Sequence, residues 1–246
     1  MPTVATASLI RRESGDDQIC VLTFDRPDSG ANIFDAATLH ELDELLDAVE
    51  KDASLRGLII TSAKKSIFVA GADLKTLLQA AKTDTLREFI EHGQKVFNRL
   101  ANLKIPTVAA IHGASAGGGY EVALACDYRV GSDDPATRIG LPETSLGLLP
   151  AWGGCTRLPR LVGIEKAAEV VLKGRLYSAG EASKIGLVDE TALPDQLLDR
   201  ARKKLRAGKR KLESGAMVES SRRDDRTPQR GVPTAINSRH ENGDSG

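Results

Sequence analysis

Two glutamates stand in stretches of the sequence where a charged side chain is uncommon. Glu121 comes just after the run Gly117-Gly-Gly119 and precedes Val-Ala-Leu-Ala, and Glu143 follows Leu-Pro and precedes a mostly apolar loop. Burying a carboxylate costs free energy, so acids are rare in such surroundings. The 22 residues between them leave room for a strand and a return loop that would bring both to one cleft. Two carboxyls that flank one water form an acid–base pair, but by spacing alone each is equally well a cap or an ion-pair partner.

The segment before Glu121 has the pattern of a strand, a glycine-rich turn and a helix. An apolar run at Thr107–Ile111 predicts a buried strand, Gly113–Gly119 predicts a turn of small residues, and Glu121–Cys126 predicts the first turns of a buried helix. Glycines allow a ligand to approach the backbone, and the first N–H groups of a helix have no partner within it. This arrangement therefore favours the binding of negative charge.

Two other motifs in this turn predict chemistry that the rest of the chain does not support. Gly113-Ala-Ser115-Ala-Gly117 matches the G-x-S-x-G motif of hydrolases, but that arrangement needs a histidine after the serine. The only such histidine is His240, in a polar tail, so Ser115 is best interpreted as a small residue in a tight turn. Gly117–Gly119 matches no complete dinucleotide-binding fingerprint.

Three further reactive or aromatic residues are interpreted mainly as structural. His112 ends an apolar strand and is expected to be a core or surface histidine, and Cys126 is expected to be a small buried residue. Trp152 lies in a loop rich in Gly and Pro, where it either lines a pocket or packs in the core.

The composition is that of one globular domain with an appendage. The chain has 246 residues, 41% of them hydrophobic, and its 34 basic and 34 acidic side chains balance, so neither a nucleic-acid partner nor a membrane surface is indicated. Its three cysteines have no paired spacing, which argues against disulfides and a zinc site and favours a reducing compartment. No signal peptide and no membrane-spanning run is evident, so we expect a soluble cytoplasmic protein.

The hydrophobic pattern predicts strands that alternate with helices of ordinary length. Asp35 is expected to cap the first helix, and Ser178 to open a later helix with a capping box. Such alternation predicts parallel strand pairing with helices outside, hence an α/β fold. Strands are predicted at residues 7–12, 19–24, 57–61, 107–111 and 128–130, a strand and turn at 64–73, and helices from 35, 74, 86, 155, 165, 178 and 194.

The character of the chain changes near residue 205. Residues 206–246 are polar, with no periodic apolar face, so we expect them to form a disordered tail, with a partner-induced helix as the alternative. The catalytic domain is expected to span residues 1–205.

Five segments in this order resemble the signatures of the enoyl-CoA hydratase/isomerase (crotonase) superfamily. The likeness covers roughly residues 5 to 205 and is greatest to the hydratase half of the multifunctional fatty-acid oxidation protein. The segments are Phe68-Val-Ala-Gly-Ala-Asp-Leu-Lys75, Ile105-Pro-Thr-Val-Ala-Ala-Ile-His-Gly113, Ala116-Gly-Gly-Gly-Tyr-Glu-Val-Ala-Leu-Ala-Cys-Asp127, Gly140-Leu-Pro-Glu143 and Leu146-Gly-Leu-Leu-Pro-Ala-Trp-Gly-Gly154.

The resemblance implies a role for individual residues. Glu121 and Glu143 correspond to the family's catalytic glutamates, and the backbone N–H groups of Ala72 and Gly118 correspond to its oxyanion hole. Donors of this kind are worth about 3 kcal/mol each in the transition state. The residues expected to border the substrate and its coenzyme A are Ala70, Gly71, Ala72, Asp73, Leu74, Lys75, Gly117 and Gly118.

The resemblance also implies the fold and the reaction. We expect the crotonase (ClpP-like) fold of repeated ββα units with surrounding helices, and hydration of trans-2-enoyl-CoA to 3-hydroxyacyl-CoA in fatty-acid β-oxidation. Coenzyme A enters as the substrate thioester, and neither a metal nor a permanently bound cofactor is expected. Family members form homo-oligomers, trimers or hexamers. Their C-terminal helices are not evident after residue 205, so we expect a shortened or standalone hydratase half.

Two alternatives remain open from the sequence. One is another reaction of CoA thioesters at the same oxyanion hole, above all double-bond isomerisation. The other is a non-catalytic subunit that binds acyl-CoA or assembles a complex, because fold likeness alone does not establish an activity.

Overall fold

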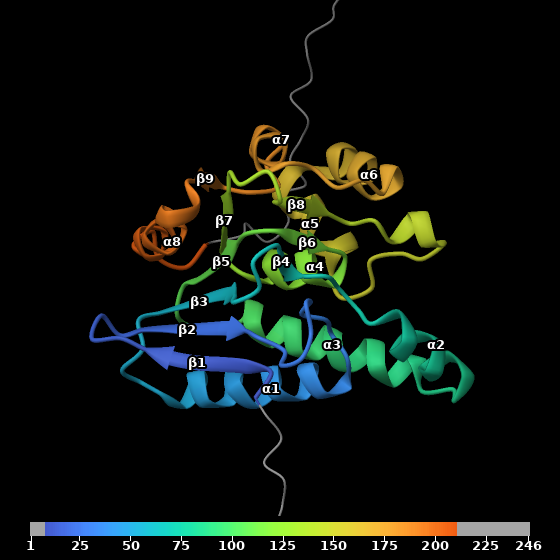
Figure 1. The fold of residues 1–246 in the computed structure, drawn as a ribbon, viewed down its shortest axis with the longest axis horizontal. Coiled ribbons are helices and arrows are strands. Elements are labelled where there is room, and N and C mark those ends of the chain that lie inside the picture. Colours follow the sequence, from blue (N-terminus) through green and yellow to red (C-terminus); the bar gives the residue numbers. More distant parts are fainter. Residues whose placement is uncertain (1–7, 211–246) are drawn as a thin grey trace, which may run out of the picture.

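A computed structural model describes residues 8–210 of the chain, and Figure 1 shows how the elements are arranged. Of the predicted tail, residues 206–210 lie within this part and pack on the domain, where Lys209 Nζ lies 3.0 Å from Asp127 Oδ2. Residues 211–246 lie outside the described residues. Within 8–210, no helix combines the length and the apolar character that crossing a membrane requires.

The larger of two sheets has six strands in the order β1-β2-β3-β5-β7-β9. β1 (Ile10–Ser14) and β2 (Ile19–Phe24) form the predicted antiparallel hairpin. All later pairings in this sheet are parallel, as the alternation of strands and helices predicted. The parallel strands that follow are β3 (Gly57–Ser62), β5 (Thr107–Ile111), β7 (Tyr128–Ser132) and β9 (Glu190–Ala192).

A second sheet of three short parallel strands lies beside the first. Its order is β4-β6-β8, and each of these strands follows a strand of the larger sheet after a short connection. The strands are β4 (Ile67–Val69), β6 (Ala114–Ala116) and β8 (Arg138–Gly140). This gives the expected ββα repeat. The sequence predicted only a turn where β6 lies and no strand where β8 lies, because strands of three residues are too short to carry a hydrophobic pattern.

Helices cover both faces of the larger sheet. α1 (Ala36–Lys51) and α3 (Leu86–Ala101) pack against each other on one face, and α8 (Leu197–Leu205) packs on β5 and β7 from the other. The remaining helices are α2 (Leu74–Lys82), α4 (Gly118–Ala125), α5 (Gly154–Val162), α6 (Ile164–Lys173), α7 (Ala179–Lys184) and the 3-10 turns η1 (Glu143–Leu146) and η2 (Pro194–Gln196).

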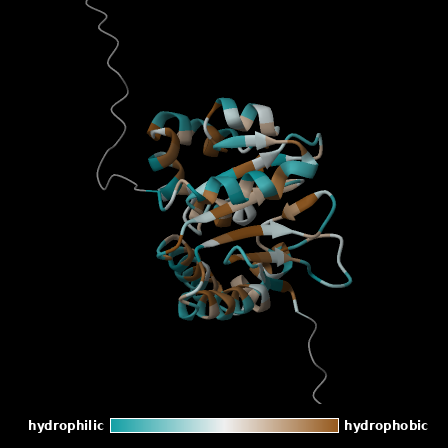
Figure 2. Cartoon of the chain, turned by 90° about the vertical axis from the view of Figure 1, so that its left-hand side faces the viewer, coloured by the Kyte–Doolittle hydropathy of each residue, from teal (hydrophilic) through white to brown (hydrophobic). Residues whose placement is uncertain are grey.

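The hydrophobic core is divided by the larger sheet. On β3, Leu58 and Ile60 face the main core with α1, α3 and α4, whereas Ile59 faces the smaller core beneath α8. A strand buried on both faces reads as a continuous apolar run, which is why β3 and β5 are predictable from the sequence. In Figure 2 the central strands carry long brown segments, while the helices alternate between brown and teal.

Helix starts follow the predicted capping. The carboxylate of Asp35 accepts the N–H of Thr38 at 2.9 Å, and Ser178 and Glu181 form a complete capping box at the start of α7. Each such cap satisfies N–H groups that have no partner inside the helix and stabilises the protein by about 1 kcal/mol.

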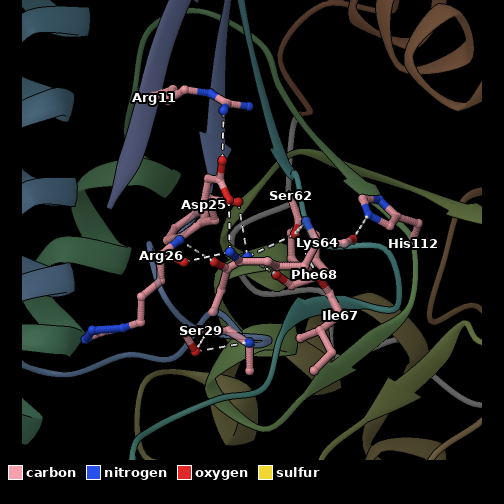
Figure 3. A network of polar contacts seen from close by, with 12 residues as sticks. Arg11, Asp25, Arg26, Ser29, Ser62, Lys64, Ile67, Phe68 and His112 are labelled. Carbon is pink, nitrogen blue, oxygen red and sulfur yellow. Dashed lines mark hydrogen bonds and ion pairs between the residues drawn. The ribbon is translucent and has the colours of Figure 1, made fainter. Parts of the chain in front are cut away.

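Polar contacts hold the loop after β2 against the turn between β3 and β4 (Figure 3). The amide of Asn32, which is only 1% exposed, donates to the carbonyls of Phe24 and Phe68 and to the hydroxyl of Ser62. Ser62 in turn donates to the carbonyl of Ile67 at 2.7 Å. The end of β4, and with it the segment that continues to residue 72, is therefore fixed by buried polar groups.

We predict that Asn32→Ala lowers the free energy of unfolding by roughly 2–4 kcal/mol, because it removes the buried hydrogen bonds that this amide makes to Phe24, Ser62 and Phe68. Chemical denaturation measures the change. Asn102→Ala is the matched control, since that side chain is exposed and has no hydrogen bond within residues 8–210, and it should change stability by less than about 0.5 kcal/mol. Equal effects of the two substitutions would contradict the role given to Asn32.

Candidate active site

The two glutamates singled out by the sequence meet at the start of α4. Glu121 lies one turn into the helix, and its N–H bonds to the carbonyl of Gly117 at 2.9 Å. Glu143, the first residue of η1, reaches the same glycine, because a Cβ built on Gly117 would lie 2.9 Å from Glu143 Oε1. Gly117 also has a φ of 53°, a conformation that side-chain-bearing residues rarely adopt. Both carboxyls therefore lie near the first turn of α4.

Glu121 is almost completely buried, at 2% exposure. Its Oε1 accepts two backbone N–H groups, from Trp152 and from Gly154, each at 2.8 Å. The pKa of this carboxyl is raised to about 7, chiefly by burial and also by the charge of Glu143, while the two N–H donors favour the ionised form and lower the pKa. A group with this pKa gains and loses a proton near neutral pH, as acid–base catalysis requires.

Glu143 is half-buried, and burial raises its pKa as well. Its Oε2 is inaccessible and has no hydrogen-bond partner within residues 8–210. Burying a carboxyl oxygen without a hydrogen-bond partner costs free energy, because its contacts with water are not replaced. Protonation of the carboxyl or a hydrogen bond from a ligand would reduce this cost. The charge of Glu143 also raises the pKa of Glu121, so the ionisation of one carboxyl affects the other.

Two backbone N–H groups lie beside this pair without an acceptor in the described chain. The Gly71 carbonyl and the Asp73 N–H both bond to Phe34, so the N–H of Ala72 between them points the other way. Gly118 is the first residue of α4, where N–H groups have no partner within the helix. The two backbones are close, because a Cβ on Gly118 would lie 3.5 Å from the Ala72 nitrogen.

The other residues predicted to border the substrate fall into two groups. Gly71 joins Ala72, Gly117 and Gly118 at the start of α4, since a Cβ on Gly71 would lie 3.3 Å from the Gly118 nitrogen. The other four residues lie at or before the start of α2. Asp73 caps this helix, and Ala70, Leu74 and Lys75 are exposed. Asp73 and Lys75 also line a cavity of about 680 Å³ between α2 and α3.

Trp152 belongs to the core, which resolves the choice that the sequence left open. Its ring is 3% exposed and packs edge to face with three phenylalanines, of which Phe34 lies 5.7 Å away between ring centroids. The indole fills the space that side chains on Gly93 and Gly118 would need. The ring thus anchors the loop whose backbone N–H groups hold Glu121.

Three residues that the sequence predicted to be structural have the contacts of structural residues. Ser115 is fully buried in β6 and its hydroxyl donates to the carbonyl of Gly119 at 3.1 Å. His112 Nε2 contacts the carbonyl of Lys64 at 2.6 Å (Figure 3). Cys126 is buried, and burial raises the pKa of its thiol to about 12.

Residues of α5 contribute to the site in ways that the sequence analysis missed. Arg157 donates to the carbonyl of Trp152 at 2.9 Å, and its charge favours ionised Glu121. Cys155 is exposed, and partial burial and the charges of both glutamates raise the pKa of its thiol. The adjacent glycines Gly153 and Gly154 were the one sequence signal for these contacts, because glycines often mark a place where the backbone itself contacts another group. Here the N–H of Gly154 contacts Glu121.

The arrangement can move a proton to or from a carbon atom next to a carbonyl. Two N–H groups can donate hydrogen bonds to a carbonyl oxygen that becomes negative, and the two carboxyls beside them can exchange protons. No group of His, Cys, Asp and Glu within residues 8–210 is arranged to hold a metal ion.

Comparison with known proteins identifies a family. The family model described as enoyl-CoA hydratase/isomerase matches residues 14–227. The fatty acid oxidation complex subunit alpha of Shewanella sp. (strain MR-4) is 45% identical over 205 residues, and that of Shewanella baltica (strain OS185) is 47% identical over 206. These alignments cover 83% of this chain but only 28% and 29% of the relatives, so the chain spans less than a third of their length.

Solved structures of similar fold include both activities that the family name contains. The enoyl-CoA hydratase of Bacillus anthracis matches with a TM-score of 0.75 and 32% identity, over 81% of this chain and 76% of that one. The human mitochondrial delta3-delta2-enoyl-CoA isomerase matches with a TM-score of 0.73 and 30% identity, over 80% and 76%. With its ββα repeat, its paired glutamates and these likenesses, the chain belongs to the enoyl-CoA hydratase/isomerase family.

Proposed function

We propose that this protein is an enoyl-CoA hydratase that adds water across the double bond of trans-2-enoyl-CoA. The observation that carries the proposal is the presence of a buried carboxyl, Glu121, and a half-buried carboxyl, Glu143, next to two backbone N–H groups without acceptors within residues 8–210. A hydratase needs one group to take a proton from water and another to give a proton to carbon. Two neighbouring carboxyls, one ionised and one protonated, meet that need.

The N–H groups of Ala72 and Gly118 bind the thioester oxygen in this proposal. As the oxygen of water bonds to the β-carbon, the electrons of the double bond shift toward the carbonyl and its oxygen becomes negative. Donors already aimed at that position stabilise the enolate more than the ground-state carbonyl, which lowers the barrier. Because the donors are backbone groups in a buried setting, they need no reorganisation during the reaction.

Glu121 and Glu143 carry the protons. The ionised member of the pair accepts a proton from the attacking water, and the protonated member then gives its proton to the α-carbon of the enolate. The product is the 3-hydroxyacyl-CoA, and the pair ends with one proton, as it began, now on the other carboxyl. Coenzyme A takes part only as a portion of the substrate.

The curated relatives support a place in fatty-acid β-oxidation, since they are named as alpha subunits of the fatty acid oxidation complex. Isomerisation of the double bond is the second candidate, and the similarity to a human enoyl-CoA isomerase favours it. In that reaction one carboxyl, Glu143, would carry a proton from one carbon to another, and Glu121 would not be needed.

Purified protein should abolish the absorbance of the conjugated enoyl thioester when it is added to trans-2-enoyl-CoA. We expect Glu121→Gln and Glu143→Gln each to lower kcat by about 10²- to 10⁴-fold, because each removes one proton-transferring group. Glu165→Gln is the matched control, since Glu165 is exposed at the start of α6, and it should leave the rate unchanged.

Two outcomes of this assay would contradict hydration. No loss of absorbance at any acyl length, with measurable binding of the CoA ester, would point to a binding subunit. Full activity of Glu121→Gln on a 3-enoyl-CoA, with loss of that activity in Glu143→Gln, would establish the isomerase.

The pH dependence of the pair gives a further prediction. Burial and the charge of Glu143 raise the pKa of Glu121 to about 7, so kcat/KM should fall as the pH rises above this value and Glu121 loses its proton. In Glu143→Gln the repulsive charge is gone while burial remains, so the pKa of Glu121 should fall but stay above the ordinary value. Titration of the Glu121 carboxyl by ¹³C NMR measures both, and an ordinary pKa in the unsubstituted protein would refute the coupled pair.

A further inference from the structure

A second cavity, separate from the glutamate pair, lies where the C-terminal ends of α3, α4 and α5 meet the last described residues. Its volume is about 340 Å³. Residues from four parts of the chain line it, so it is a built feature of the fold. The charged residues that line it are Asp127, Arg129, Arg157, Arg160, Lys209 and Arg210.

The cavity has an excess of positive charge. Five cationic side chains line it, against the one carboxylate of Asp127. Asp127 contacts Lys209 Nζ at 3.0 Å, and Asp189, behind the cavity, pairs with both Arg129 and Arg210. Two carboxylates therefore offset two of the five positive charges, which leaves an excess of three around the cavity.

Two of these arginines have no carboxylate partner within residues 8–210. Arg157 donates only to neutral acceptors, the carbonyl of Trp152 at 2.9 Å and the side-chain oxygen of Asn98 at 2.6 Å. Burial lowers the pKa of Arg157, which expresses the cost of keeping its charge away from water. Arg160 is exposed at the rim and has no hydrogen bond in the described chain.

A third arginine has unused hydrogen-bonding capacity in the wall. Arg129 is 2% exposed, and its Nε has no acceptor within residues 8–210, although its terminal nitrogens bond to Asp189 and to the carbonyl of Cys126. A buried donor without an acceptor is destabilising. An anion in the cavity would offset the cost of the unpaired charge of Arg157 and add a further negative charge beside Arg129.

We propose that this cavity is an anion-binding site for a phosphate group. Guanidinium groups bind phosphate oxygens in a bidentate manner, and several arginines around one concavity are the arrangement that recognises such a dianion. The phosphate is either free or part of a small organic molecule, since the chemistry of the wall is the same for both.

The site is linked to Glu121 by a short chain of hydrogen bonds. Arg157 donates to the backbone carbonyl of Trp152 at 2.9 Å, and the backbone N–H of Trp152 donates to Glu121 Oε1 at 2.8 Å. Glu143 and Arg157 are the charged groups that act most directly on Glu121, with opposite sign. A bound phosphate neutralises Arg157, so Glu121 becomes harder to ionise. The effect on catalysis rests on the function proposed above, but the site itself does not.

Calorimetric titration of the full 246-residue chain tests the site. Inorganic phosphate is added at constant ionic strength set with sodium chloride, so that general screening does not change. We expect saturable binding that Arg160→Gln weakens at least tenfold and that Arg87→Gln, an exposed arginine on α3 far from the cavity in sequence, leaves unchanged. Heats equal to those of chloride, or equal binding by the Arg160→Gln protein, would overturn the proposal.

Two further measurements sharpen the result. Adenosine 3′,5′-bisphosphate replaces inorganic phosphate in a parallel titration, and tighter binding that Arg160→Gln also weakens identifies an organic phosphate as the ligand. In ¹³C NMR, saturating phosphate should raise the pKa of Glu121 in the unsubstituted protein and not in Arg160→Gln. This readout needs no turnover, so it is independent of the proposed reaction. Binding without a shift in Glu121 would overturn the link between the two sites.

Discussion

The burial of one carboxyl, Glu121, is the constraint on which the rest of the site depends. A carboxylate out of water is unstable unless donors surround it, and here two N–H groups of the loop before α5 reach one of its oxygens. That loop is in turn fixed by the Trp152 ring, packed among phenylalanines. Stability and reactivity are thus joined, since the same contacts that make the burial tolerable also set the proton affinity of the group.

The smaller sheet brings backbone, rather than side chains, to the start of α4. Its three strands have only three residues each, and the segment after β4 passes close to the first residue of α4. A larger side chain at Gly117 or Gly118 would meet Glu143 or Trp152 instead of a ligand. Pre-formed backbone donors of this kind cost little to organise during a reaction, because packing already holds them.

The sequence predicted well those features that depend on residue type at a regular spacing. The caps at Asp35 and Ser178, the runs of β3 and β5, and the convergence of Glu121 with Glu143 all have such signatures. The strands β6 and β8 do not, and neither do the backbone donors to Glu121, because any residue type has an N–H group. The positions of Ala72 and Gly118 followed from family resemblance alone, and their roles stay a prediction.

The sequence separation of the contacts around the buried acids determines when the site can exist. The donors to Glu121 lie 31 and 33 residues further along the chain, and Lys209 and the backbone of Arg210 reach Asp127 across 82 and 83 residues. During synthesis the β1-β2 hairpin can pair as soon as both strands exist. Glu121 obtains its donors only after the start of α5 has been made, and Asp127 only after residue 210. Both buried acids thus obtain these donors only from segments that are synthesised after them.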